Sequence, residues 1–282
     1  PNKKIPKLAA WLKKSLVAGK VNLIHLDYKN KKINGVLGVS NAELEFSSDW
    51  PQINDIDAVI SLQNDVVKVT ANNATILSAP VRSLDLIYDK KVNDTLIKLH
   101  GTIDTNIENA IEYIMQSPLQ HNLGKNLAKL NPVGEISLSL KLDIDLDKTE
   151  DIKTFGSIKL IDNKLMLQDW NLPIQHLRGD IDFTNDSVSS QKLQLNLLGQ
   201  NATGTINTIQ FPSHNLKIVL TLPLAITQLQ KLLPTINLEH FSGMAQATVG
   251  IELPLDRKNI NKTFSIKSDL IGVSINLPEP FN

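Results

Sequence analysis

The stretch from Ile136 to Leu146 constrains the fold of this chain more than any other part of the sequence. An aliphatic residue stands at every second position, and Ser, Lys or Asp stands between them. A period of two places alternate side chains on opposite faces of a β-strand, one dry and one wet. Because burying each aliphatic side chain stabilises a fold by roughly 1.5–3 kcal/mol, the dry face must be covered. The sequence leaves open whether protein or a non-protein ligand covers it.

The composition narrows the class of protein. Of the 282 residues, 41% are hydrophobic and 21% are charged, which is typical of a folded globular chain. The 29 basic and 29 acidic residues cancel, so no overall field attracts nucleic acid or an anionic membrane. The chain has no cysteine, which excludes disulfides, thiolate metal sites and cysteine nucleophiles. We therefore expect no nucleic-acid partner.

Motifs for catalysis are missing from the sequence. It contains no Gly-x-Ser-x-Gly elbow, no Walker-type loop and no Gly-x-Gly-x-x-Gly, and the six histidines are scattered. The acidic run Asp143, Asp145, Asp147 resembles the opening of a calcium loop, but Lys148 stands where that loop needs Gly. Asp143 and Asp145 are better explained as the wet face of the alternating strand. The sequence thus predicts no enzyme, no catalytic residue, no metal and no cofactor.

The rest of the chain is organised as strands with a few short helices. Hydrophobic residues at helical spacing predict helices over Ile5–Leu16, Ile107–Ile114, Asn122–Leu130 and Ala225–Leu233. Turn signals such as Asn64-Asp65, Asn72-Asn73 and Asn93-Asp94 separate the predicted strands. The strands of the first half are expected at Val21–Lys29, Ala42–Phe46, Ala58–Leu62, Val66–Ala71, Thr75–Leu77, Leu84–Tyr88 and Leu96–Ile103. Those of the second half are expected at Ile136–Leu146, Thr154–Ile161, Lys164–Leu167, Gly179–Phe183, Leu193–Leu198, Ala202–Ile206, Leu216–Leu222, Ala245–Leu253, Phe264–Leu270 and Gly272–Leu277.

These elements predict a mostly β fold. The predicted helices are too few to cover the apolar faces of all the strands. Therefore either two sheets pack as a sandwich or one sheet curls around an interior. Aromatic residues, which usually help to fill a sandwich core, make up only 5% of the chain. This favours a long, strongly curled antiparallel sheet that forms a groove with an apolar interior. We divide it into a first segment, residues 1–130, with the N-terminal amphipathic helix and a helical interruption near 105–130, and a second segment of long meandering strands, residues 131–282. We expect the second segment to continue the same sheet.

Several short motifs resemble, in order, the YhdP branch of the AsmA-like proteins of Gram-negative bacteria. They are the opening helix Pro6–Leu12, Asp49-Trp50-Pro51, Ser117-Pro118-Leu119, Gly134 with its alternating strand, Gly179–Phe183, and a final strand that ends in Leu277-Pro278-x-Pro280. Each motif is loose, so their order and spacing carry the resemblance, which covers nearly the whole chain.

The resemblance implies a non-enzymatic segment of a bridge-like protein that conveys phospholipids across the periplasm, between inner and outer membrane, along an apolar groove. It also implies an inner-membrane anchor through an N-terminal helix that is not in this chain, and phospholipid acyl chains as partners. An alternative is a scaffold for outer-membrane proteins that pairs its sheet edges with client strands. The candidate lipid-binding residues are Leu138, Leu140, Leu142, Ile144, Leu193, Leu195, Leu197, Leu216, Ile218, Leu220, Val249, Ile251 and Leu253.

Overall fold

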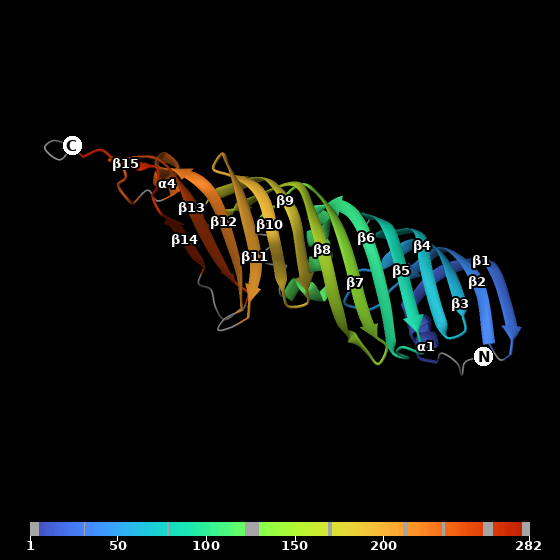
Figure 1. The fold of residues 1–282 in the computed structure, drawn as a ribbon. Coiled ribbons are helices and arrows are strands. Elements are labelled where there is room, and N and C mark those ends of the chain that lie inside the picture. Colours follow the sequence, from blue (N-terminus) through green and yellow to red (C-terminus); the bar gives the residue numbers. More distant parts are fainter. Residues whose placement is uncertain are drawn as a thin grey trace. The chain divides into compact units, whose positions relative to one another are not determined.

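The computed structural model describes residues 6–30, 32–77, 79–121, 130–168, 171–210, 214–232, 235–255 and 262–277 (Figure 1). The helices are α1 (Pro6–Ser15), α2 (Ile107–Met115), the 3-10 turn η1 (Pro118–His121) and α4 (Ile226–Leu232). The strands of the first half are β1 (Leu16–Lys29), β2 (Lys32–Leu44), β3 (Ile53–Gln63), β4 (Val66–Ile76), β5 (Ala79–Asp89), β6 (Leu96–Asn106), β7 (Glu135–Asp145) and β8 (Lys148–Leu167). They are followed by β9 (Leu172–Thr184), β10 (Val188–Leu197), β11 (Gln200–Ile209), β12 (Asn215–Ala225), β13 (Phe241–Pro254), β14 (Thr263–Ser268) and β15 (Val273–Ile275).

Within the described residues the strands form one antiparallel sheet of 15 strands. Its order follows the sequence from β1 to β14, and β15 pairs with β13. This confirms the mostly β fold predicted from the sequence. No helix in the described part of the chain is both long and apolar enough to span a membrane.

The chain divides into two compact units. Unit 1 comprises Pro1–Lys125, Glu135–Ile158 and Phe183–Asp186, and unit 2 comprises Asn126–Gly134, Lys159–Asp182 and Ser187–Asn282. Each unit has its own run of paired strands, β1 to β7 in unit 1 and β10 to β15 in unit 2.

A line of β-bulges crosses neighbouring strands of unit 1. The register shifts between Val39 and Ala42 in β2, and between Asn54 and Asp57 in β3. Asn41 and Asp55 lie inside these shifts with positive φ angles of 49° and 52°, a conformation that Asn and Asp tolerate better than most residues. A bulge bends its strand and increases its twist, so a line of bulges curls the sheet.

Side chains replace some of the backbone hydrogen bonds that the bulges disrupt. The Asn41 N–H donates to Oδ1 of Asp57 at 3.0 Å, and the Thr75 hydroxyl donates to Oδ2 of Asp55 at 2.8 Å. The Asn73 side-chain amide donates to the Asp55 carbonyl at 3.3 Å. The expected turn at Asn72-Asn73 is therefore wrong. Asn is common both in turns and in bulges, so the residue type alone does not distinguish them. Here β4 continues through Asn72 and Asn73 as one strand.

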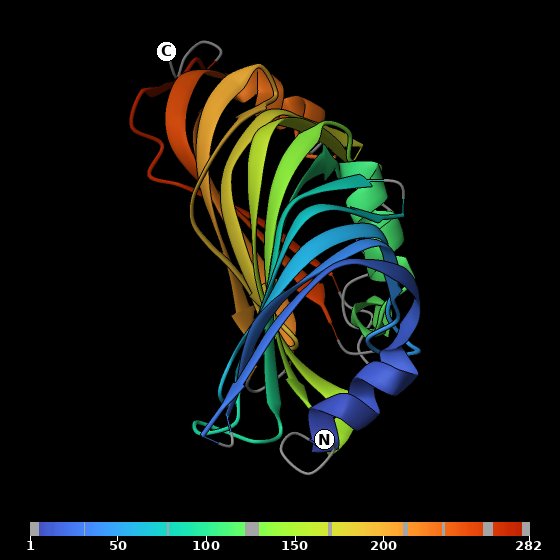
Figure 2. The ribbon, with the colours of Figure 1, turned by 90° about the vertical axis from the view of Figure 1, so that its right-hand side faces the viewer.

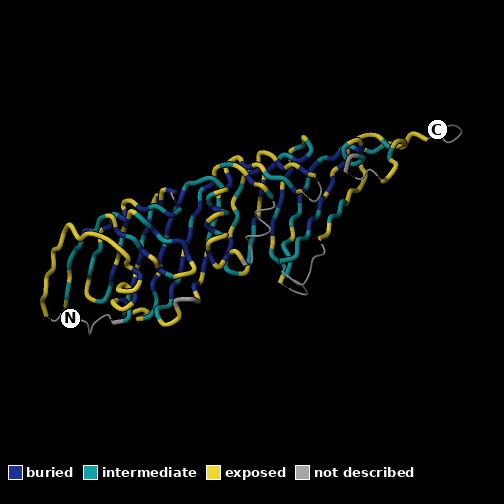
Figure 3. Tube along the Cα trace, turned by 180° about the vertical axis from the view of Figure 1, so that it is seen from behind, coloured by how far each residue is buried: buried dark blue, intermediate teal, exposed yellow. Residues whose placement is uncertain are grey.

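The strands of unit 1 bend along their length, and α1 and α2 lie on the concave side of the bend (Figure 2). Leu8 and Trp11 of α1 and Ala110 and Tyr113 of α2 are buried, so the apolar faces of both helices are covered by protein. In contrast, β1 is exposed along all of its 14 residues (Figure 3).

Other elements differ from the prediction in length more than in type. The helices α1, α2 and α4 begin and end within two residues of the predicted bounds. The strands predicted at Thr154–Ile161 and Lys164–Leu167 are one strand, β8, and β2 begins ten residues earlier than expected. The helix predicted at Asn122–Leu130 lies almost wholly outside the described residues.

Gly156 of β8 lies under the ring of Phe183 in β9. A Cβ atom added at Gly156 would overlap the Phe183 ring, whereas a Cβ added at Gly101 of β6 would meet its nearest atoms at 3.6 Å, an ordinary contact. Gly156→Ala is therefore expected to lower the free energy of unfolding by about 1–3 kcal/mol, as overpacking does.

Gly101→Ala is the matched control for this prediction, and we expect it to change stability by less than about 0.5 kcal/mol. Urea denaturation followed by circular dichroism measures both variants. Adding Phe183→Leu to Gly156→Ala should restore part of the loss, and equal stabilities of the two alanine variants would contradict the packing described for Gly156.

Candidate functional site

Continuous rows of apolar side chains cross the strands of unit 1 at right angles. Residues that face each other directly in neighbouring strands point to the same side of a sheet. One such row contains Leu37, Ile60, Val69, Leu86, Leu99 and Leu142, from β2 to β7. The adjacent row contains Leu62, Val67, Tyr88, Ile97 and Ile144. The strand pairing thus joins the dry faces of single strands into one apolar surface.

Unit 2 has the same arrangement. One row contains Leu193, Gly204, Leu220, Val249 and Ile266, from β10 to β14. The next contains Ile206, Ile218, Ile251 and Phe264. Glycine and alanine stand between the larger side chains, as Gly204 does in the first row.

The 13 candidate residues all belong to these apolar faces, four in unit 1 and nine in unit 2. Ten of them are buried: Leu138, Leu140, Leu142, Ile144, Leu193, Leu195, Leu197, Leu220, Val249 and Ile251. Leu216, Ile218 and Leu253 are only half-buried, and Leu216 lies directly opposite Leu253. The structure therefore brings together the candidates of β12 and β13, which face each other in pairs, whereas the strands beside β7 and β10 contain no candidate. The three half-buried residues are the most accessible candidates.

An aromatic cluster closes part of the apolar side of unit 1. The Trp50 ring lies 5.8 Å, centroid to centroid, from both Phe46 and Tyr113. All three residues are buried, and burial raises the pKa of the Tyr113 hydroxyl far above its ordinary value of 10.0. The cover that the sequence left open is thus protein at this place.

The opposite face of each strand is polar, so the two faces differ in chemistry. Ser137, Lys141 and Asp143 of β7 alternate with its buried leucines. Hydrocarbon side chains offer no specific polar contact, so the apolar face can bind another apolar group only through hydrophobic burial and close packing. Among the described residues no cluster of three or more His, Asp or Glu side chains is suited to a metal ion.

Sequence reasoning missed part of the apolar face of unit 1. Ile97, Leu99 and Leu86 face the same side as Leu142 and Ile144 but were not among the candidates. The alternation from Leu96 to Ile103 was the signal that could have found them. It is weaker there because Gly101 interrupts the apolar positions and the apolar Leu96 stands on the polar face, opposite Asp145.

The fold and this face define a class of protein, an extended antiparallel β-sheet with one continuous apolar face in each unit. The chain belongs to the YhdP protein family, whose model matches residues 4–282. It is 23% identical over 271 residues to the intermembrane phospholipid transporter YhdP of Escherichia coli (strain K12). The match covers 93% of this chain and 21% of that protein. The chain thus spans about a fifth of the length of this relative. No solved structure matches the chain.

Proposed function

We propose that this chain is a segment of a lipid-transport protein and that phospholipid acyl chains move along its apolar faces. The observation that supports this most directly is the set of apolar rows that run from strand to strand. A row perpendicular to the strands gives a hydrocarbon chain a similar apolar contact at each step of about 4.8 Å. The relative named as a phospholipid transporter supports the choice of cargo.

The remaining parts of the proposal come from the family. The protein would act in the periplasm without catalysing a reaction, with an inner-membrane anchor outside this chain and the outer membrane at the far end. Ten of the 13 candidate residues are buried by protein. Leu216, Ile218 and Leu253, which are half-buried, would be the first to meet an acyl chain.

Ile218→Asp is expected to abolish lipid transport while the fold survives. An acyl chain that passes the carboxylate would remove its hydration, and this desolvation has a large unfavourable free energy. Ile218 is half-buried, so its replacement costs the fold less than a charge at Leu140, which is buried. We would measure complementation of cells that lack the protein and confirm folding of the purified variant by circular dichroism.

Val219→Asp is the matched control because Val219 is the next residue, is also half-buried and faces the polar side. A photo-crosslinker placed at residue 218 should capture phospholipid in cells, and one at residue 219 should not. Equal lipid capture at both positions, or unimpaired transport by Ile218→Asp, would refute the proposal.

The scaffold alternative has one observation in its favour. β1 is a terminal strand of the described sheet and is exposed along all 14 residues, including the large apolar side chains of Leu23, Ile24 and Leu26. An exposed edge of this length can pair with another strand. Crosslinking from β1 that captures outer-membrane proteins, together with no lipid captured from residue 218, would favour the scaffold.

A further inference from the structure

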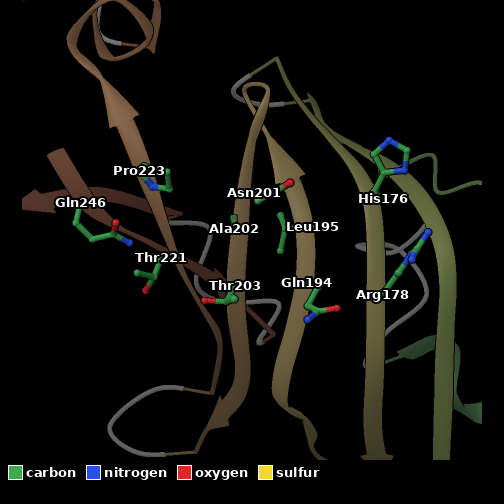
Figure 4. Close-up of a pocket in the computed structure, with 10 residues that line it drawn as sticks. All are labelled: His176, Arg178, Gln194, Leu195, Asn201, Ala202, Thr203, Thr221, Pro223 and Gln246. Carbon is green, nitrogen blue, oxygen red and sulfur yellow. The ribbon is translucent and has the colours of Figure 1, made fainter. Parts of the chain in front are cut away.

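The polar face of unit 2 contains a hollow of about 590 Å³ between β9 and β13 (Figure 4). Gln194, Thr203 and Thr221 lie directly opposite one another in β10, β11 and β12, and so form a polar row along its floor. Amide and hydroxyl groups can both donate and accept hydrogen bonds. This row lies on the other side of the sheet from the apolar row of Leu193 and Leu220.

Arg178 continues this row in β9. The neighbouring Gly179 packs against the backbone of Lys192 and Leu193, and the Ser190 hydroxyl donates to the Asp180 carbonyl at 2.6 Å. In an antiparallel pair these two contacts place Arg178 beside Gln194, as Figure 4 also shows. The guanidinium therefore stands at one end of a row of neutral donors.

Asp162 of β8 fixes the side chains at this end of the hollow. Its Oδ1 atom accepts hydrogen bonds from Nε and Nη2 of Arg178 at 3.3 and 3.1 Å, and lies 3.0 Å from Nδ1 of His176. The bonds from His176 and Arg178 hold the pKa of Asp162 below its ordinary value, so the carboxylate stays charged. The guanidinium is planar and holds its five N–H donors in fixed directions. With Nε and one N–H of Nη2 bonded to Asp162, the N–H groups of Nη1 and the second N–H of Nη2 point away from the carboxylate and can bind a ligand.

The backbone at this position departs from a regular strand. His176 has a φ of 52°, and Gln175 and His176 are both exposed between the buried Ile174 and Leu177. A bulge of this kind redirects a side chain and is common next to functional sites. The bulge lets the chain pass from the buried Ile174 to the buried Leu177 over two exposed residues, and His176 shares the exposed face with Arg178, two residues further on.

The charge of the lining residues favours an anion. Among the described residues that line the hollow, Arg178 and His176 are basic and none is Asp or Glu. A second hollow of about 410 Å³, on the polar face of unit 1, differs because its lysines Lys68, Lys98 and Lys141 stand beside Asp85 and Asp143. The two carboxylates there lie in the hollow itself and would repel a bound anion, whereas Asp162 pairs with Arg178 and His176 from outside the lining of the unit 2 hollow. A site for a neutral sugar would be expected to carry aromatic rings, and His176 has the only aromatic ring among the described lining residues.

We propose that this hollow binds a small organic phosphate, with the phosphate group on Arg178 and His176 and the hydroxyl-bearing remainder along Gln194, Thr203 and Thr221. Guanidinium and phosphate pair through parallel charge-assisted hydrogen bonds. The site is distinct from the apolar faces and does not depend on the proposed transport of acyl chains. The phosphate can come from a soluble ester or from a phospholipid headgroup.

The test uses the purified chain and sn-glycerol 3-phosphate in isothermal titration calorimetry, with glycerol as the uncharged control. Arg178→Gln should weaken binding at least about tenfold, since one charge-assisted pair is lost. Lys217→Gln is the matched control, because Lys217 is an exposed cation on the same face and contacts Glu252 at 4.0 Å outside the hollow. We expect it to change affinity less than about twofold.

A second arm distinguishes the sources of the phosphate. Flotation with vesicles of phosphatidylglycerol and phosphatidylcholine, compared with the Arg178→Gln chain, identifies a lipid headgroup if the wild type alone floats. Binding of glycerol 3-phosphate without flotation identifies a soluble ester. No binding to either probe, or equal weakening by Arg178→Gln and Lys217→Gln with both variants folded, would overturn the proposal.

Discussion

Replacing Trp50 with alanine is expected to lower the free energy of unfolding of unit 1 by about 3–5 kcal/mol, the usual cost of removing a large buried aromatic side chain. Trp50 is buried between Phe46 and Tyr113. These residues come from the segment after β2 and from α2, so the indole joins parts of unit 1 that are far apart in sequence. Its removal leaves a cavity that Phe46 and Tyr113 cannot both fill.

Urea denaturation followed by far-ultraviolet circular dichroism measures this loss without relying on the tryptophan signal. Trp50→Phe should cost less than half as much, because a ring stays in place. Tyr28→Ala is the control for an aromatic side chain that is 71% exposed, and it should change stability by less than about 1 kcal/mol. A loss at Trp50→Ala no greater than that of Tyr28→Ala would show that water reaches the cluster.

Alkaline pH is expected to destabilise unit 1 through Tyr113. Burial raises the pKa of Tyr113 in the folded state, whereas the unfolded chain releases the phenolic proton at its ordinary pKa of about 10. Above pH 10 the unfolded state therefore binds fewer protons than the folded state, and stability falls as pH rises. The Tyr113 contribution is fully present below pH 10 and decreases by about 1.4 kcal/mol for each pH unit above it.

Comparison with Tyr113→Phe isolates this effect from the titration of the lysines. The difference in unfolding free energy between wild type and Tyr113→Phe should stay constant from pH 8 to 9.5 and then shift in favour of the variant up to pH 11.5. Parallel curves for wild type and Tyr113→Phe would show that the folded state ionises as readily as the unfolded one.

The apolar faces could be predicted one strand at a time. The alternation from Ile136 to Leu146 identified the buried side of β7, where Leu142 and Ile144 are almost completely inaccessible to solvent. The same pattern identified Leu193, Leu195 and Leu197 in β10. Such predictions succeed because the side-chain period of a strand is a local property of the backbone and does not depend on its partners.

The bulges show where local chemistry is ambiguous. Asn72-Asn73 predicted a turn, and Asn41 gave no clear signal, yet both lie beside positions where the register of neighbouring strands shifts. Asn and Asp are common in turns and in bulges alike, and of the residues named here Asn41 has a positive φ angle while Asn72 and Asn73 do not. Whether the chain reverses or only bends there depends on the hydrogen bonds offered by the adjacent strand.

The sequence by itself thus determined the class of fold, the family and the dry side of each strand, because these follow from composition, motif order and a period of two. Tertiary structure alone decided which residues share a row, since register is a relation between strands. It also brought Asp162, His176 and Arg178 to one end of a polar hollow, although the sequence had shown only a scattered histidine. Hydrogen bonds between β8 and β9 created that arrangement. His176 and Arg178 share a face because they are two residues apart, but no spacing along the chain places Asp162 beside them.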